Sequence, residues 1–169
     1  MRLSNRSKIP KYNFVNTVLF MMLVGGVMGF FLERYKFNIL GIESYLLIII
    51  PIIIIAVFFF RGRQVFEYDS DGEALNFKNR NIVPFVDQPL SDEFPKYKLI
   101  RYEIVSMFLI KRLYVTISSK NNGSTMLKYE ISYLTRMEIN DLRLSLNKVV
   151  KANSEKKVLS VDDNRRILA

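Results

Sequence analysis

Two uncharged apolar runs near the start of the chain constrain its fold more than any other feature. Val15–Leu32 has eighteen residues without a charge, and Ser44–Phe60 has seventeen, SYLLIIIPIIIIAVFFF. At about 1.5 Å of rise per residue, each run as a helix spans most of a hydrocarbon core that is about 30 Å thick. We therefore expect two transmembrane helices, joined in a hairpin, within residues 15–60.

Residues at the edges of these runs fit membrane helices. Tyr12 and Phe14 precede the first run and Tyr35 follows it, at the depth where aromatic rings favour lipid headgroups. Pro51, in the middle of the second run, lacks a backbone N–H, so we expect the second helix to bend there. A cleaved signal peptide at residues 1–29 fits less well, because the apolar stretch is long for that purpose and no A-x-A-like site follows.

Basic residues gather on one side of the two runs. The connecting segment, residues 33–43, balances two basic residues with two glutamates. Basic residues near the ends of membrane helices are retained in the cytoplasm. We therefore expect both termini to be cytoplasmic, with residues 1–14 as a basic N-terminal segment. The basic residues expected to set the topology and to face lipid are Arg2, Arg6, Lys8, Lys11, Arg61 and Arg63.

Three glycines give the first run a small face. Gly25 and Gly29 have the GxxxG spacing, and Gly26 widens the face. Faces of this kind let helices approach closely in lipid. The helix that packs there is either the chain's own second helix, around Pro51, or a helix of another protein or of a second copy. We expect these three glycines and Pro51 to be helix-packing positions.

Composition narrows the possible functions. The 169 residues include no cysteine and no histidine, which removes disulfides, thiolate and imidazole chemistry and the usual zinc, haem and iron–sulfur ligands. No paired carboxylates, Ser–Lys spacing or glycine-rich phosphate loop stands out, so we expect no catalysis, no cofactor and no metal site. The net charge is +9, but residues 61–169 carry 19 basic against 14 acidic residues. Contact with anionic lipid accounts for this mild excess with fewer assumptions than nucleic-acid binding.

Residues 61–152 begin with patterns typical of antiparallel strands. Residues 64–79, QVFEYDSDGEALNFKN, predict a hairpin, because Asp71-Gly72 tolerates the positive φ of a tight turn. The segment Ile82–Val86 contains Pro84 and is at best an edge strand, and residues 87–95 predict a polar loop.

Three further strands are expected after this loop. Residues 97–110 and 112–118 are rich in β-branched and aromatic residues, and Lys111-Arg112 is the expected tight connection between them. Residues 120–124, KNNGS, predict a turn before a last strand at Thr125–Ile131.

The end of the domain changes to helical periodicity. Apolar residues recur at helical spacing, so Arg136–Ala152 is predicted to be an amphipathic helix that packs on the sheet. Thr135, with Glu138 three residues later, is a capping box at its start. Residues 153–169 are mostly charged, and we expect a poorly ordered tail.

This order of elements resembles the bacterial pleckstrin-homology-like (PH-like) domains of small two-helix membrane proteins. The likeness covers residues 61–150 and depends on the YDSDGEALNF hairpin and the ISYLTRMEINDLRLSL strand-to-helix junction. The resemblance implies an α+β membrane protein whose cytoplasmic domain is a binding or assembly scaffold and not a catalyst. The basic motif that reads phosphoinositides in eukaryotic relatives is not evident, since Asp69, Asp71 and Glu73 are acidic.

From these features we expect a non-catalytic accessory or assembly subunit of a larger complex in a bacterial inner membrane. Its expected partners are other integral membrane proteins and membrane lipids, with no nucleic acid. The alternative is a self-assembling or anionic-lipid-sensing module without a fixed partner.

Overall fold

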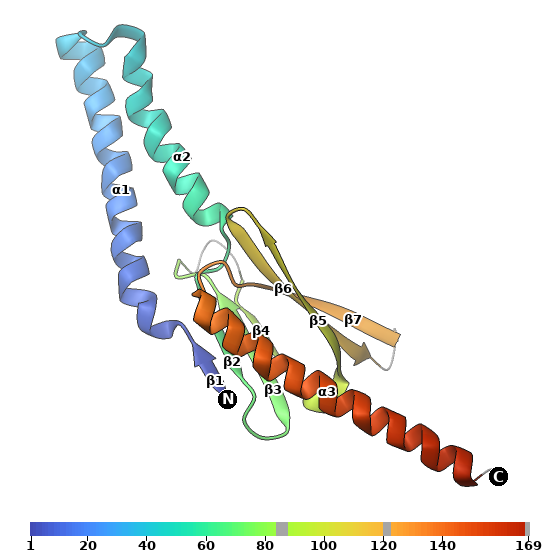
Figure 1. Ribbon diagram of the computed structural model, residues 1–169. Coiled ribbons are helices and arrows are strands. Elements are labelled where there is room, and N and C mark those ends of the chain that lie inside the picture. Colours follow the sequence, from blue (N-terminus) through green and yellow to red (C-terminus); the bar gives the residue numbers. More distant parts are fainter. Residues whose placement is uncertain (84–87, 120–122, 168–169) are drawn as a thin grey trace.

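The computed structural model describes residues 1–83, 88–119 and 123–167, and residues 158–167 by their backbone alone. The architecture is α+β: two long apolar helices extend from one end of a pair of antiparallel sheets, and a C-terminal helix lies along the sheets (Figure 1). This coarse arrangement confirms the expected order of apolar helices, antiparallel strands and final helix.

The two apolar helices form an antiparallel hairpin. The first helix begins at Ile9, six residues before the start of the apolar run at Val15. It begins early because Pro10 suits the first turn of a helix and no residue between Pro10 and Val15 breaks the helix. Two helical stretches, Arg6–Phe37 and Gly41–Phe60, are long and apolar enough to cross a membrane by length and composition. The hairpin consists of α1 (Ile9–Leu32), a π-helical turn (Glu33–Phe37), a 3-10 turn (Gly41–Tyr45) and α2 (Leu46–Phe60).

Four antiparallel strands form the first sheet, in the order β1-β2-β3-β4. The predicted hairpin at residues 64–79 is confirmed as β2 and β3, with Gly72 at φ +69° in the turn. Ile82 and Val83 form a bend after β3, and the rest of the predicted edge strand Ile82–Val86 lies outside the described residues. The strands are β1 (Arg2–Ser4), β2 (Val65–Asp69), β3 (Ala74–Arg80) and β4 (Leu90–Pro95).

Two sequence predictions for this sheet are wrong. The first is the loop at residues 87–95: residue 87 lies outside the described residues, but Leu90–Pro95 form β4, which pairs with β3 and places Phe94 in the core. The second is the separation of the N-terminal segment, residues 1–14, from the β domain. Residues 2–4 pair with β2 instead, and Leu3 is buried with the core residues. The apolar hairpin is therefore inserted between the first and second strands of the β domain.

Three antiparallel strands form the second sheet, in the order β5-β6-β7. The turn between β5 and β6 is at Phe108-Leu109 and not at Lys111-Arg112, which pair with β5 from within β6. The predicted last strand is confirmed as β7, while residues 120–122 of the predicted turn before it lie outside the described residues. The strands are β5 (Leu99–Met107), β6 (Ile110–Ser119) and β7 (Gly123–Glu130).

The C-terminal helix is longer than the sequence predicts. α3 spans Arg136–Ile167, so the helix continues fifteen residues beyond the expected end at Ala152. The reason is that no glycine or proline interrupts the chain between these ends. The capping box at its start is confirmed: the backbone N–H of Glu138 donates to Oγ1 of Thr135 at 3.3 Å, and that of Thr135 donates to the Glu138 carboxylate at 2.7 Å.

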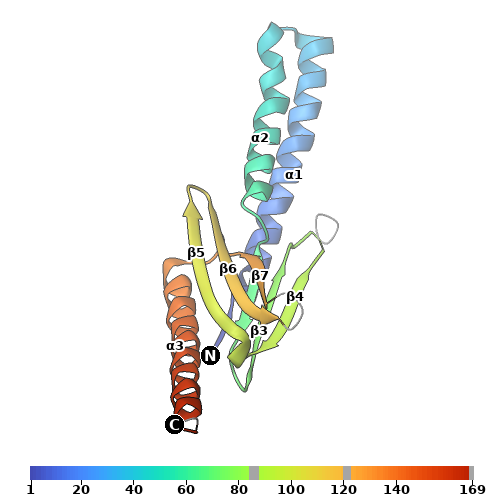
Figure 2. The same cartoon turned by 90° about the vertical axis from the view of Figure 1, so that its right-hand side faces the viewer.

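One core joins both sheets and α3. The Phe77 ring from β3 stacks on Tyr129 of β7, with 4.8 Å between centroids, and on Phe94 of β4 at 5.6 Å. Leu142 and Leu146 of α3 are fully buried against this core, and α3 runs alongside β5 (Figure 2). The domain thus has a complete hydrophobic core of its own, to which residues from before and after the hairpin contribute.

Candidate functional site at the hairpin junction and the sheet face

The two helices of the hairpin pack through small residues. A Cβ added to Gly26 would collide with the backbone carbonyl of Leu47 and lie 3.2 Å from the Pro51 ring, so only glycine fits there. Gly29 also faces α2, because a Cβ added there would lie 3.6 Å from the Leu47 side chain, an ordinary contact distance. A Cβ at Gly25 would have no neighbour within 4 Å. The helices therefore pack on Gly26 and Gly29, while Gly25 points away from α2.

The start of α1 is tied to the β domain by polar contacts. Asn5 is completely buried, donates from Nδ2 to the carbonyl of Gln64 at 2.8 Å and accepts from the N–H of Phe66 at 2.8 Å. Lys8 donates to both carboxylate oxygens of Glu138, at 2.7 and 2.8 Å. These contacts connect the chain that enters α1 to β2 and to the first turn of α3.

Tyr133, in the loop between β7 and α3, connects both helices of the hairpin. Its ring lies edge-on to Tyr12 of α1, at 5.3 Å between centroids, and edge-on to Phe58 of α2 at 5.9 Å. Its hydroxyl donates to the carbonyl of Phe58 at 2.7 Å. The guanidinium of Arg61 lies 4.8 Å from the centre of the same ring, within cation–π distance, and donates to the carbonyl of Ser132 at 3.4 Å.

The chain that leaves α2 is fixed by Glu130 at the end of β7. The carboxylate of Glu130 accepts the N–H of Arg63 at 2.7 Å, and the Arg63 guanidinium lies 3.7 Å from it. Gly62 has φ +89°, and a Cβ there would lie 2.6 Å from the same carboxylate. Asn79 is buried and links this point to β2 and β7 through the carbonyls of Val65 and Glu130. Both ends of the hairpin are therefore held by the domain at several points. We call this region of contact between the hairpin ends and the domain the junction.

Glu138 and Tyr133, which hold the junction from the side of the domain, have shifted pKa values. Burial alone would raise the pKa of Glu138, but hydrogen bonds from Lys8 and Thr135 outweigh it and hold that pKa below its ordinary value of 4.5. Burial raises the pKa of Tyr133, with Arg61 acting in the opposite direction. At neutral pH, Glu138 is thus ionised and Tyr133 is neutral, which are the forms that their contacts need.

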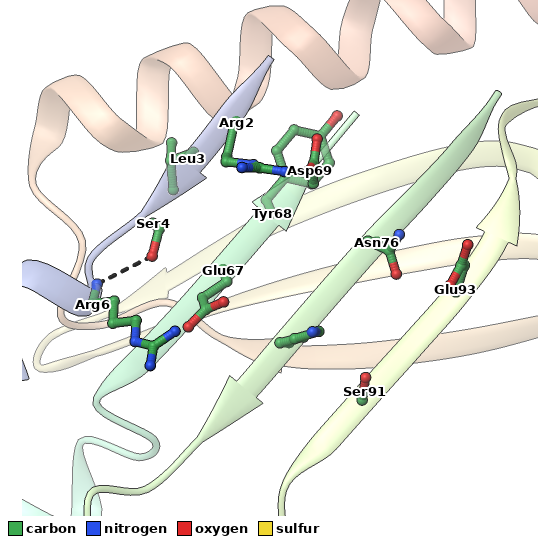
Figure 3. Close-up of a pocket in the computed structure, with 11 residues that line it drawn as sticks. Arg2, Leu3, Ser4, Arg6, Glu67, Tyr68, Asp69, Asn76, Ser91 and Glu93 are labelled. Atoms are coloured by element: carbon green, nitrogen blue, oxygen red, sulfur yellow. Dashed lines mark hydrogen bonds and ion pairs between the residues drawn. The ribbon is translucent and has the colours of Figure 1, made fainter. Parts of the chain in front are cut away.

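The outer face of the first sheet forms a polar groove with a volume of about 530 Å³ (Figure 3). Side chains from neighbouring strands stand opposite one another across it: Ser4 is in register with Glu67, which is in register with Lys78. Three basic and three acidic side chains balance in charge. The groove is lined by Arg2, Leu3, Ser4, Arg6, Glu67, Tyr68, Asp69, Asn76, Lys78, Ser91 and Glu93.

One ion pair lies at the end of the groove away from the hairpin. The Arg2 guanidinium donates from Nε to the Asp69 carboxylate at 2.9 Å. The pKa of Asp69 is lowered, first by a hydrogen bond from the backbone N–H of Asp71 and then by Arg2. Arg2 therefore contacts the protein's own sheet.

The groove and the junction present polar and charged side chains that can form hydrogen bonds. Within residues 1–83, 88–119 and 123–157, whose side chains the structure describes, no three metal-ligating side chains gather in a way that could hold a metal ion. The groove offers both hydrogen-bond donors and acceptors, and its basic and acidic side chains are equal in number.

Most of the residues that the sequence singled out lie in one of three regions: the groove, the junction or the interior of the hairpin. Arg2 and Arg6 line the groove, whereas Lys8, Arg61 and Arg63 belong to the junction. Lys11 is exposed on the first turns of α1. Gly26, Gly29 and Pro51 lie between the two helices of the hairpin, whereas Gly25 has no neighbour on α2.

Sequence reasoning missed Asn5, Glu130 and Tyr133. Each is a common residue type, and its role depends on contacts across more than 50 positions, so no local pattern marks it. The capping box did mark Glu138, although its ion pair with Lys8 spans 130 positions.

Comparisons of this chain with protein-family models, with curated proteins and with solved structures find no match.

Proposed function

We propose that this protein is a non-catalytic accessory or assembly subunit of a larger protein complex in a bacterial inner membrane. In this proposal α1 and α2 cross the membrane and both termini are cytoplasmic. The β domain is PH-like and presents its polar groove to a partner at the cytoplasmic face.

The observation that carries the proposal is the insertion of the hairpin between β1 and β2, with both of its ends fixed at the junction. A domain on one flexible linker samples many orientations relative to its anchor. Here the linkers are short, and hydrogen bonds of Asn5, Lys8 and Arg63 fix them to the domain, so the groove keeps one orientation relative to the hairpin. A fixed binding face beside a membrane anchor is what an assembly subunit needs.

Two further features support a binding role. Seven antiparallel strands followed by one C-terminal helix agree with the element order that the PH-like resemblance implies, although β1 precedes the hairpin. The outer faces of α1 and α2 expose large apolar side chains along their length, including Phe20 and Ile53, and Gly25 is free of contact with α2. Lipid or the helices of a partner complex would cover these faces.

The experiment is purification of the full chain, tagged at its C-terminus, from its own membranes in mild detergent, followed by mass spectrometry of proteins that accompany it in fixed ratio. We expect at least one integral membrane protein in fixed stoichiometry. Recovery of the protein alone would contradict the proposal.

A matched pair of charge reversals tests whether the groove is the contact surface. Lys78 lies in the groove on β3, and Lys128 is an equally accessible lysine on β7 of the other sheet. We expect Lys78→Glu to lose the partner and Lys128→Glu to retain it. Equal retention by both variants would place the contact elsewhere, on the hairpin.

The alternative function is a self-assembling or anionic-lipid-sensing module. The exposed Lys11, at the end of α1 nearest the domain, favours it, because a basic residue close to an anionic leaflet contributes about 1 kcal/mol of attraction. This alternative predicts recovery without a partner, together with retention on vesicles of anionic lipid that weakens as salt increases.

A further inference from the structure

The turn between β5 and β6 carries three consecutive exposed apolar residues, which we call the apolar tip. Met107 is 66%, Phe108 99% and Leu109 40% exposed. Exposed apolar residues are normal when they are scattered. Among the described residues of the β domain, however, no other three successive positions are all large, apolar and exposed.

The backbone at the apolar tip adds a second observation. Phe108 has φ +42°, in the left-handed region, in a two-residue turn closed by the pairing of Met107 with Ile110. Glycine, asparagine and aspartate are the residues preferred at such a position, and a bulky residue there is strained. No contact within the protein offsets this strain, since the ring is almost completely exposed. Folding therefore does not account for a phenylalanine at this position.

The apolar tip lies at the end of the domain from which the hairpin extends. In both views, the β5–β6 turn reaches the level at which α2 ends, and it points in the direction of the hairpin (Figures 1 and 2). Three phenylalanines, Phe58 to Phe60, end α2 at that level, and Lys111 and Arg112 follow the tip in sequence. The apolar tip thus lies at the level of the apolar end of α2 (Figures 1 and 2), and two basic residues, Lys111 and Arg112, follow it within three positions.

From this placement we infer that the β5–β6 turn is a third membrane contact, with Met107, Phe108 and Leu109 inserted between the lipid headgroups of the cytoplasmic leaflet. The inference rests on the proposed insertion of the hairpin into the membrane. Aromatic rings are favoured at headgroup depth, and basic residues behind them lie close to anionic lipid. Three points of contact, α1, α2 and the apolar tip, define a plane, so the domain cannot rotate about the hairpin axis.

The absence of tryptophan from the chain allows a direct test. The full-length variant Phe108→Trp is placed in vesicles of phosphatidylethanolamine and phosphatidylglycerol, with or without lipids brominated along the acyl chain. We expect blue-shifted emission, quenching by bromines near the headgroup and little quenching by aqueous acrylamide. Leu109→Trp is a second reporter at the same turn if the first variant does not fold.

Two control variants separate this inference from the proposed function. Phe20→Trp reports on the middle of α1, and Tyr97→Trp on an aromatic residue, 71% exposed, at the end of the sheets away from the hairpin. We expect deep bromines to quench Phe20→Trp, and acrylamide to quench Tyr97→Trp. If lipid bromines do not quench Phe20→Trp, the membrane placement itself fails.

If Phe20→Trp is quenched by lipid and Phe108→Trp is quenched only by acrylamide, the hairpin is inserted and the inference about the apolar tip is overturned. Protection of Phe108→Trp from both bromine and acrylamide would also overturn it, because the tip would then be covered by protein.

Discussion

The β domain buries most of its large apolar side chains, whereas the hairpin exposes many of its own. In the domain, Phe77, Leu113 and Tyr129 are fully buried and stack or pack on one another. In the hairpin, Phe20 and Ile53 are exposed, and Gly26 and Gly29 of α1 pack against α2. The domain therefore supplies its own core, whereas the hairpin leaves large apolar side chains exposed. Substitutions of the same kind should have different effects in the two regions.

The largest contrast is expected between two phenylalanine truncations. Phe77→Ala removes the ring between Tyr129 and Phe94, and we expect it to lower the free energy of unfolding of the domain by about 3–5 kcal/mol. Phe20→Ala should change that free energy by less than about 0.5 kcal/mol. Denaturant unfolding of the full chain in detergent, followed by tyrosine circular dichroism, measures both. An equal loss of unfolding free energy in the two variants would contradict the conclusion that the domain has a core independent of the hairpin.

The next contrast concerns the strand that precedes the hairpin. Asn5→Ala leaves the buried N–H of Phe66 and carbonyl of Gln64 without their partner, so we expect a loss of about 2–3 kcal/mol in the same measurement. Asn76→Ala, the same substitution on the groove face, is the control and should be close to neutral. A neutral Asn5→Ala would show that β1 is not an integral part of the domain.

Within the hairpin, two adjacent glycines should differ. Gly26→Ala forces α1 and α2 apart, and we expect it to weaken their association by about 1–2 kcal/mol, because the collision is with backbone. Gly25→Ala meets nothing and should have little effect. Hydrogen exchange of the α2 amides in detergent measures the difference. Faster exchange in Gly25→Ala than in Gly26→Ala would reverse the assignment of the packing face.

The smallest effect is expected at the junction and depends on pH. The pKa of Glu138 is lower when folded, so its contribution to stability is complete above about pH 4.5 and is lost as the pH falls through the folded value. We expect Glu138→Gln to lose about 1 kcal/mol at pH 7 and the difference from the wild type to shrink on acidification. Glu103→Gln, on the exposed face of β5, is the control. A difference that grows in acid would contradict the role of the Lys8–Glu138 pair.

The parts of the fold that depend on local pattern could be predicted from the sequence. The two apolar runs, the Asp71-Gly72 turn and the Thr135–Glu138 capping box each have a physical cause within a few residues. The structure bears out the helices, the β2–β3 hairpin and the start of α3 at those places. The end of α3 was predicted too early because charge alone does not stop a helix that contains no glycine or proline.

The rest depends on contacts between distant residues. A three-residue strand with one apolar side chain, Leu3, carries no recognisable pattern, and it forms only because β2 offers an unpaired edge 60 residues later. The turn at Phe108 was misplaced because phenylalanine is a poor turn residue. The groove and the junction are assembled from both sides of the hairpin, so the sequence indicated some of their residues without showing that they meet.

The central claim, that the hairpin crosses a membrane and holds the domain on one side of it, is tested most directly by cysteine labelling. The chain has no cysteine, so single cysteines at Ile39, between the helices, and at Leu144, on α3, are unique and exposed. With a maleimide that does not cross membranes, we predict labelling of Ile39→Cys in intact cells whose outer barrier is permeable, and of Leu144→Cys only in inverted vesicles. Labelling of both positions from the same side would contradict the claim.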